Sequence, residues 1–225
     1  MTPEDSTTRQ LDIVTRTHGR VLLSGDRAGA ALHLLVGFHG YAQNADDMLG
    51  ELRSIPGAER WTIVSVQALH RFYRGRSDVT VASWMTRQDR DVQIEDNIAY
   101  GDAVLSQVAA GRRVERLVYC GFSQGVAMAF RAGVRGHQRA DLIAVLGGDV
   151  PPELLSDPSA RFPRVLLARG RHDDFYGLDR FRAEVQALRE RDVNVDDLTV
   201  DSGHEWSPAF RQAVGARLAE LTVSE

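Results

Sequence analysis

The sequence has very little cysteine and no long apolar run. Its one cysteine, Cys120, excludes a disulfide bond within the chain. No stretch approaches the roughly 20 consecutive apolar residues of a membrane-spanning helix, and the first residues lack the apolar centre of a secretion signal. There is no long basic block, and the formal net charge of -4 argues against nucleic acid as a partner. We therefore expect a cytoplasmic protein with no membrane span.

What the chain does contain is enough apolar sequence for one folded unit. Its 225 residues are 43% hydrophobic, which suits a single core. The sequence has no internal repeat, low-complexity tract or linker. We expect one domain over residues 1–225, with about ten flexible residues at the N-terminus.

Apolar runs alternate with helix patterns from residue 31 onward. The runs predict strands at 31–38, 61–66, 117–120, 142–146, 165–168 and 195–200. Patterns of period 3.6 predict helices at 45–53, 92–110, 126–132, 178–191 and 208–221, with N-caps at Asn44, Asp91 and Ser207. Residues 11–23 predict a hairpin, residues 67–90 a long functional or mobile loop, and the prolines near 151 another loop. This alternation predicts a mostly parallel sheet with helices on both faces.

The segment Gly121-Phe122-Ser123-Gln124-Gly125 says most about chemistry. It has the pattern Gly-x-Ser-x-Gly between a strand and a helix, which is typical of the nucleophile elbow of an α/β-hydrolase. The glycines are needed because the turn is too tight for side chains. Ser123 is therefore the candidate nucleophile. The alternative interpretation is that Ser123 only caps the helix of a fold used for binding.

A serine hydroxyl needs a general base, and the base needs an orienting carboxylate. In this fold the acid and then the histidine follow the serine along the chain. Asp173 follows the strand 165–168, and His204 follows the last strand. Ser123, Asp173 and His204 therefore converge at the carboxyl edge of the sheet. Alternatives remain for two of these roles: Asp174 and Asp149 for the acid, and His172 for the base.

Two backbone N–H groups are needed to stabilise an oxyanion. One is expected from Gln124, directly after the nucleophile. The other should come from the loop after the strand 31–38, where Gly40 lets the backbone bend. We assign this second donor to Tyr41, with Gly40 as the alternative. His39 is expected to order the loop rather than to act as a base.

Four segments together resemble the phospholipase/carboxylesterase family of α/β-hydrolases, which includes acyl-protein thioesterases and small carboxylesterases. They are Phe38-His39-Gly40-Tyr41, Gly121-Phe122-Ser123-Gln124-Gly125, Gly170-Arg171-His172-Asp173 and Ser202-Gly203-His204. Trp84 and the run Gly147-Gly148-Asp149-Val150-Pro151 are similar to further family features, so the resemblance covers roughly residues 31–222. It implies an α/β-hydrolase fold without a separate cap domain, and it allows a homodimer.

The chain departs from that family beside the expected acyl pocket. Asp173 is followed by Asp174-Phe175-Tyr176 where the family has a hydrophobe and proline, and Trp84 is followed by Met85-Thr86. Substrate-pocket candidates are Trp84, Phe72, Tyr73 and Phe175. Arginines around Phe72 either receive an anionic group or pair with nearby acids on a solvated loop.

The sequence therefore predicts a serine hydrolase (a carboxylesterase) acting on a small-molecule ester or thioester with a small or medium acyl chain. We expect no cofactor and no metal, because no zinc-type ligand spacing and no phosphate-binding glycine loop is present. One alternative is a dienelactone-type or peptide-bond hydrolase. Another is a binding protein with a hydrolase fold and no activity.

Overall fold

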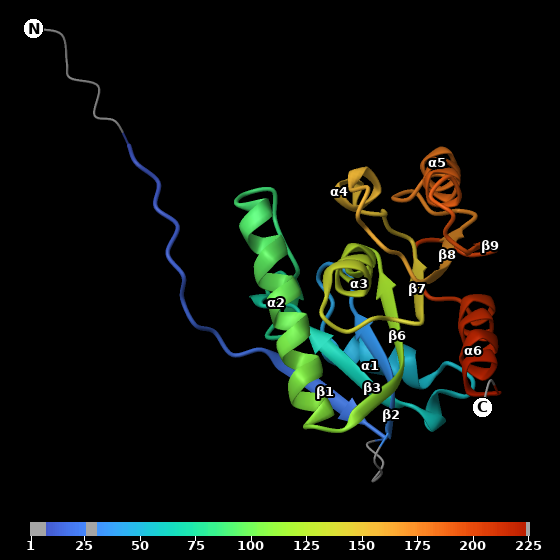
Figure 1. Ribbon diagram of the computed structural model, residues 1–225. Helices are drawn as coiled ribbons and strands as arrows, with labels where there is room; N and C mark the ends of the chain where they lie inside the picture. The colour runs from blue at the N-terminus through green and yellow to red at the C-terminus, as the bar shows by residue number, and fades with distance from the viewer. Residues whose placement is uncertain (1–7, 26–30, 224–225) are drawn as a thin grey trace, which may run out of the picture.

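A seven-stranded sheet forms the centre of the computed structural model, which describes residues 8–25 and 31–223. Its strand order is β1-β3-β2-β6-β7-β8-β9 (Figure 1). Only β1 runs antiparallel to its neighbour, and the other pairs are parallel. The strands are β1 Arg20–Ser24, β2 Ala31–Phe38, β3 Thr62–Gln67, β6 Arg113–Phe122, β7 Leu142–Leu146, β8 Arg164–Gly170 and β9 Val195–Val200.

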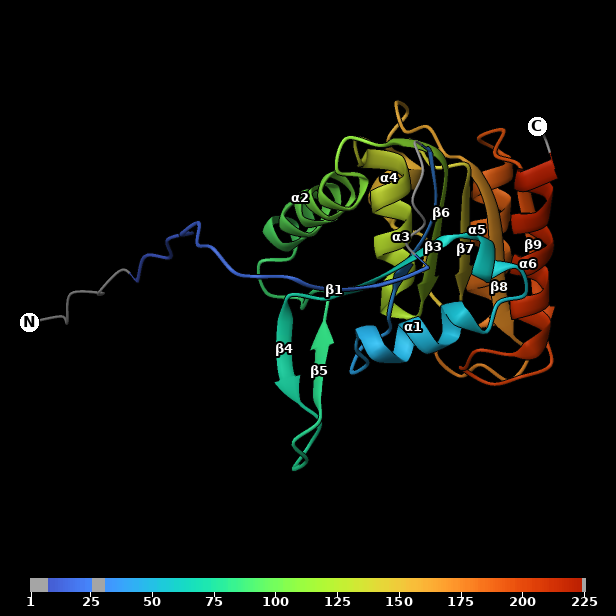
Figure 2. The ribbon, with the colours of Figure 1, turned by 90° about the horizontal axis from the view of Figure 1, so that it is seen from below.

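Helices cover both faces of this sheet (Figure 2). Successive residues of a strand point to opposite faces, so Leu34 and Val36 join one core cluster and Leu35 joins the other. The first cluster is closed by α2 Arg90–Ala109, α3 Gln124–Arg135, α4 Pro152–Ser156 and α5 Leu178–Arg189. The second is closed by α1 Ala45–Arg53 and α6 Pro208–Val223. The predicted sheet with helices on both faces is confirmed.

Two of the three predicted helix caps are confirmed. Asn44 accepts hydrogen bonds from the first turn of α1, and Asp47 returns one, which forms a capping box. The Ser207 hydroxyl accepts the N–H of Phe210 at 3.2 Å. The predicted cap Asp91 was wrong, because α2 begins after Asp89, which has a left-handed backbone and makes no side-chain cap.

Three predictions outside the main sheet were wrong. Residues 11–17 form no hairpin with β1, which pairs with β3 instead. Residues 67–90 are not a plain loop, because β4 His70–Tyr73 and β5 Thr80–Ser83 form a hairpin beside the main sheet (Figure 2). The loop expected near residue 151 contains α4. Of the ten residues expected to be flexible, 1–7 lie outside the described residues.

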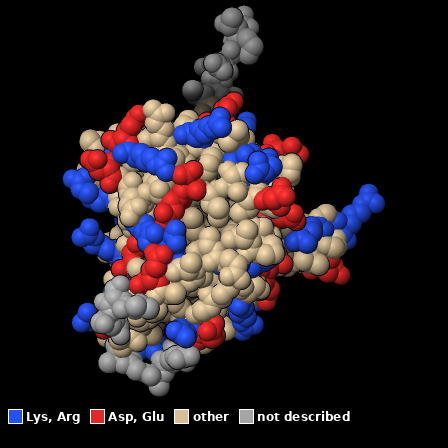
Figure 3. Space-filling view, turned by 90° about the vertical axis from the view of Figure 1, so that its right-hand side faces the viewer, with Lys and Arg blue, Asp and Glu red and all other residues tan. Residues whose placement is uncertain are grey.

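Charge on the surface is mixed in sign. All 27 basic residues of the chain are arginines, and on the face seen in Figure 3 they alternate with acidic side chains. Within the described residues, no helix combines the length and apolarity needed to cross a bilayer.

Candidate active site

The turn between β6 and α3 holds Ser123 in a backbone conformation that is rare for a residue with a side chain. Its φ is 52° and its ψ is -120°. A Cβ on Gly125 would collide with the carbonyl oxygen of Phe38, and one on Gly121 would lie 2.5 Å from the oxygen of Gly125. The Ser123 N–H donates to the carbonyl of Leu146 on β7 at 3.0 Å. Close packing therefore fixes this strained turn, as expected for a nucleophile elbow.

Three side chains from separate loops form one chain of hydrogen bonds. The Ser123 Oγ lies 2.9 Å from His204 Nε2, and His204 Nδ1 lies 2.8 Å from Asp173 Oδ2. The other Asp173 oxygen accepts the N–H groups of Phe175 and Tyr176 at 2.8 and 2.9 Å. With Nδ1 donating to the carboxylate, Nε2 is the nitrogen left to accept the serine proton.

The competing candidates take no part in this chain of hydrogen bonds. Asp174 is exposed, whereas Asp173 is buried. Asp149 lies 2.6 Å from Arg180. His172 is exposed, with its Nε2 3.3 Å from Asp201. These contacts leave the alternative acids and base outside the hydrogen-bonded chain that contains Ser123.

Gln124 begins α3, so its backbone N–H has no partner within the helix. Its side chain is held in place by β5 and the residues after it. Oε1 accepts the N–H of Trp84 at 2.9 Å, and Nε2 donates to the carbonyl of Met85 at 2.9 Å. These bonds fix the position of the residue that follows Ser123.

The loop after β2 lies against the elbow. A Cβ on Gly40 would be 3.3 Å from the Cβ of Ser123. The Gly40 N–H already donates to Gln43 Oε1 at 2.8 Å, which favours the next residue, Tyr41, as the second oxyanion donor.

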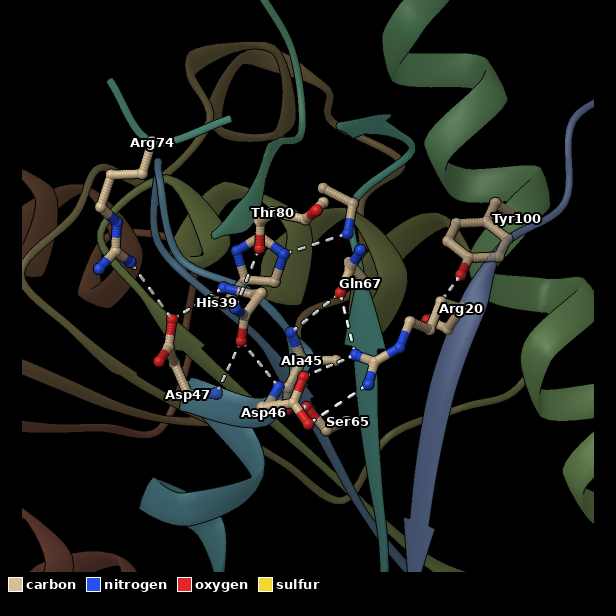
Figure 4. A network of polar contacts seen from close by, with 12 residues as sticks. Arg20, His39, Ala45, Asp46, Asp47, Ser65, Gln67, Arg74, Thr80 and Tyr100 are labelled. Atoms are coloured by element: carbon tan, nitrogen blue, oxygen red, sulfur yellow. Dashed lines mark hydrogen bonds and ion pairs between the residues drawn. The ribbon is translucent and has the colours of Figure 1, made fainter. Parts of the chain in front are cut away.

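His39, whose polar contacts are partly drawn in Figure 4, orders this loop. Its ring is fully buried, and Nε2 accepts the N–H of Ala68 at 3.1 Å. Nδ1 lies 2.7 Å from the carbonyl oxygen of Gly40 and must therefore carry the proton. Burial lowers the pKa of His39 from its ordinary value. The neutral ring thus joins the loop to the end of β3.

A cavity of about 400 Å³ opens beside Ser123 and His204. Of the four predicted pocket residues only Phe175 lines it, with its ring centre 4.9 Å from that of His204. Trp84 is buried in the core, where its Nε1–H donates to the carbonyl of His39 at 2.8 Å. Phe72 and Tyr73 both lie on β4 of the hairpin, where the ring centre of Phe72 is 5.5 Å from that of Tyr41 and Tyr73 is exposed.

Sequence reasoning missed three arginines that line this cavity: Arg90, Arg131 and Arg180. One signal was available, since Gln124, Ala127 and Arg131 follow the serine at helical spacing and share one helix face. In the part of the chain that the structure describes, no cluster of three or more histidine, cysteine or acidic side chains could hold a metal ion.

The fold is that of known esterases. No protein-family model matches the chain, and no curated protein matches its sequence. The structure of esterase PE8 has a TM-score of 0.70 at 22% identity, covering 90% of this chain and 98% of that one. The structure of acyl-protein thioesterase 2 of Zea mays has a TM-score of 0.67 at 19% identity, covering 91% of this chain and 99% of that one. The structure of a phospholipase/carboxylesterase of Dyadobacter fermentans has a TM-score of 0.67 at 17% identity, covering 92% of this chain and 99% of that one. The predicted α/β-hydrolase fold is confirmed.

Proposed function

We propose that the protein is a serine hydrolase that cleaves carboxylic esters, and thioesters of similar size, through an acyl-enzyme on Ser123. The observation that carries this proposal is the unbroken hydrogen-bonded chain from Ser123 Oγ through His204 to Asp173, mounted on a strained elbow. A fold used only for binding has no need of a serine held in this conformation against a histidine.

The first half of the reaction forms the acyl-enzyme. The Ser123 Oγ attacks the ester carbonyl carbon while His204 Nε2 takes the hydroxyl proton. Asp173 holds the ring in the required tautomer and stabilises the imidazolium. The N–H groups of Gln124 and Tyr41 donate to the oxyanion, and a single such donor is typically worth about 10²–10³ in rate.

The second half releases the acid. His204 gives its proton to the departing alcohol or thiol, and the carbonyl re-forms with the acyl group on Ser123. His204 then takes a proton from a water molecule, whose oxygen attacks the acyl carbon. The bond between this carbon and Ser123 Oγ breaks, His204 returns the proton to Ser123 Oγ, and the carboxylic acid is freed. No step requires a cofactor. A cytoplasmic location, a homodimer and a single domain over the whole chain stay predictions.

The test is hydrolysis of 4-nitrophenyl butyrate by the wild type and by Ser123→Ala. We expect the variant to fold and to lose activity by about 10⁴-fold or more. Ser106→Ala is the matched control, because Ser106 is exposed on α2, and it should keep full activity. Turnover by Ser123→Ala within tenfold of the wild type would contradict the proposal. The butyryl thioester of N-acetylcysteamine, assayed alongside, measures the ester-to-thioester preference.

A further inference from the structure

The cavity beside Ser123 is unusually rich in guanidinium groups. Arg90 reaches it from α2, Arg131 from α3 and Arg180 from α5. They share the lining with Phe175 and Met85. A fatty acyl chain placed there would remove water from charged groups without replacing their hydrogen bonds, which is unfavourable.

Arg131 is the most deeply placed of the three. Its side chain is 1% exposed. Nε and Nη2 both contact Glu153 Oε1, at 2.8 and 2.7 Å. Nη1 lies 3.6 Å from the sulfur of Met85, and a thioether is only a weak acceptor. Burial lowers the pKa of Arg131. Its Nη1 is therefore a buried charged donor at the cavity wall without a strong acceptor.

The positive charge on this wall is incompletely balanced. Glu153 also forms an ion pair with Arg90, whose Nη2 lies 3.4 Å from Glu153 Oε2. One carboxylate therefore faces two guanidinium groups. Arg90 also lies 3.8 Å from Asp91, but that side chain is 97% exposed, where an ion pair counts for little.

Around Arg180 the carboxylates outnumber the guanidinium group. Arg180 Nε lies 2.6 Å from Asp149 Oδ1 and 3.3 Å from Glu184 Oε1. Asp149 also lines the cavity. An anion entering the cavity is therefore directed away from Asp149 and toward Arg131 and Arg90.

The helix sets the distance from this wall to the reacting carbon. Arg131 lies eight residues beyond Ser123, which is roughly 12 Å along the axis of an α-helix. A helical side chain leans back toward the N-terminus, which brings the guanidinium several ångströms nearer to Ser123 than the Arg131 Cα is. The contact between carboxylate and guanidinium takes up part of this distance, so a chain of at most about four methylene groups fits between the carboxylate and the reacting carbonyl.

We propose that the substrate ester carries a carboxylate, held by Arg131 and Arg90, at the far end of the group that fills this cavity. Two guanidinium groups can both donate charge-assisted hydrogen bonds to one carboxylate, with Arg131 donating from Nη1. The inference rests on the proposed function, since it specifies the substrate of the same Ser123.

Paired substrates that differ only in charge test it. On the acyl side, mono-4-nitrophenyl adipate is compared with 4-nitrophenyl hexanoate. On the alcohol side, 4-butyryloxybenzoate is compared with its methyl ester. The measured quantity is the ratio of kcat/KM for the charged ester to that for the neutral one, in the wild type and in Arg131→Gln. The ratio cancels any general damage to the enzyme.

We expect Arg131→Gln to lower the ratio about 10- to 100-fold for one pair, the usual effect of losing a charge-assisted hydrogen bond. The pair affected tells whether the carboxylate belongs to the acyl or the alcohol group. Arg90→Gln should lower the same ratio by a smaller factor, and it keeps the test decisive if Arg131→Gln fails to fold. Arg135→Gln is the matched control, because Arg135 lies on the same helix as Arg131, pairs with Glu95 of α2 and does not line the cavity.

Ratios unchanged in both arginine variants for both pairs would overturn the inference, and so would an equal fall in Arg135→Gln. Calorimetric binding of adipate separates this outcome from failure of the proposed function. Adipate binding by the wild type that is lost in Arg131→Gln supports the anion site even if no ester is hydrolysed. Absence of adipate binding together with unchanged ratios refutes the site while leaving hydrolysis of neutral esters untouched.

Discussion

Replacing Asp173 by asparagine isolates the part of the site that controls the histidine. Asp173 Oδ1 accepts two backbone N–H groups, from Phe175 and Tyr176. The amide oxygen of asparagine would keep these two bonds, so its NH₂ group would face His204 Nδ1. Two donors cannot face each other, and the ring would therefore carry its proton on Nε2. That tautomer cannot accept the proton of Ser123.

The expected cost is about 10⁴-fold in kcat, or about 5.5 kcal/mol in the activation free energy, because the geometry survives while the tautomer is wrong. The assay is the initial rate with 4-nitrophenyl butyrate, with circular dichroism as the check on folding. Asp174→Asn is the matched control, since its carboxylate is exposed one residue away, and it should lose less than about twofold. If Asp173→Asn kept a tenth of the activity, or Asp174→Asn lost as much, the assigned role of Asp173 would be refuted.

Three further predictions concern stability and reactivity. Gly125→Ala should destabilise the protein by about 3 kcal/mol in urea unfolding, because its Cβ would collide with Phe38. The control is Gly50→Ala in α1, where a Cβ meets open space, and it should raise the free energy of unfolding by about 0.5–1 kcal/mol. Equal changes in the two variants would contradict the close packing at Gly125. Burial lowers the pKa of His39 below its ordinary value of 6.5. As the pH falls, His39 therefore takes up a proton in the unfolded chain before it does so in the folded protein. The free energy of unfolding should thus fall as pH drops below 6.5, and less so in His39→Gln; parallel pH curves would refute this. Burial raises the pKa of Cys120 to about 12, so iodoacetamide should alkylate only the unfolded protein, and rapid labelling of the native protein would contradict it.

The sequence predicted best where short-range chemistry decides the structure. The strand patterns of β2, β7 and β9 and the N-cap at Asn44 are local, and the structure has them as predicted. The elbow was recognisable because Gly121 and Gly125 have no room for a Cβ, a requirement that fixes the residue type.

The sequence predicted worst where distant contacts decide it. The hairpin of β4 and β5 is anchored by Asn44, whose Nδ2 donates to the carbonyl of Thr80 at 3.1 Å. Trp84 is in the core rather than the pocket because its indole N–H finds the carbonyl of His39. No local pattern contains either contact, so hydrophobic periodicity alone could not predict them.

The arginine wall illustrates the same difficulty for the site. Arg90, Arg131 and Arg180 lie on three different helices and meet only after the helices have packed. In the sequence each is one of 27 arginines dispersed among acids. The triad could be predicted because the fold dictates the order of its members, whereas no such rule governs residues that select the substrate.

The most direct test of the central claim is the intact mass of the protein after treatment with a fluorophosphonate, for the wild type and Ser123→Ala side by side. Such reagents phosphonylate a serine that an adjacent histidine has activated. We predict one adduct on the wild type and none on the variant. An unmodified, correctly folded wild type, or an adduct that persists in Ser123→Ala, would contradict the assignment of Ser123 as the nucleophile.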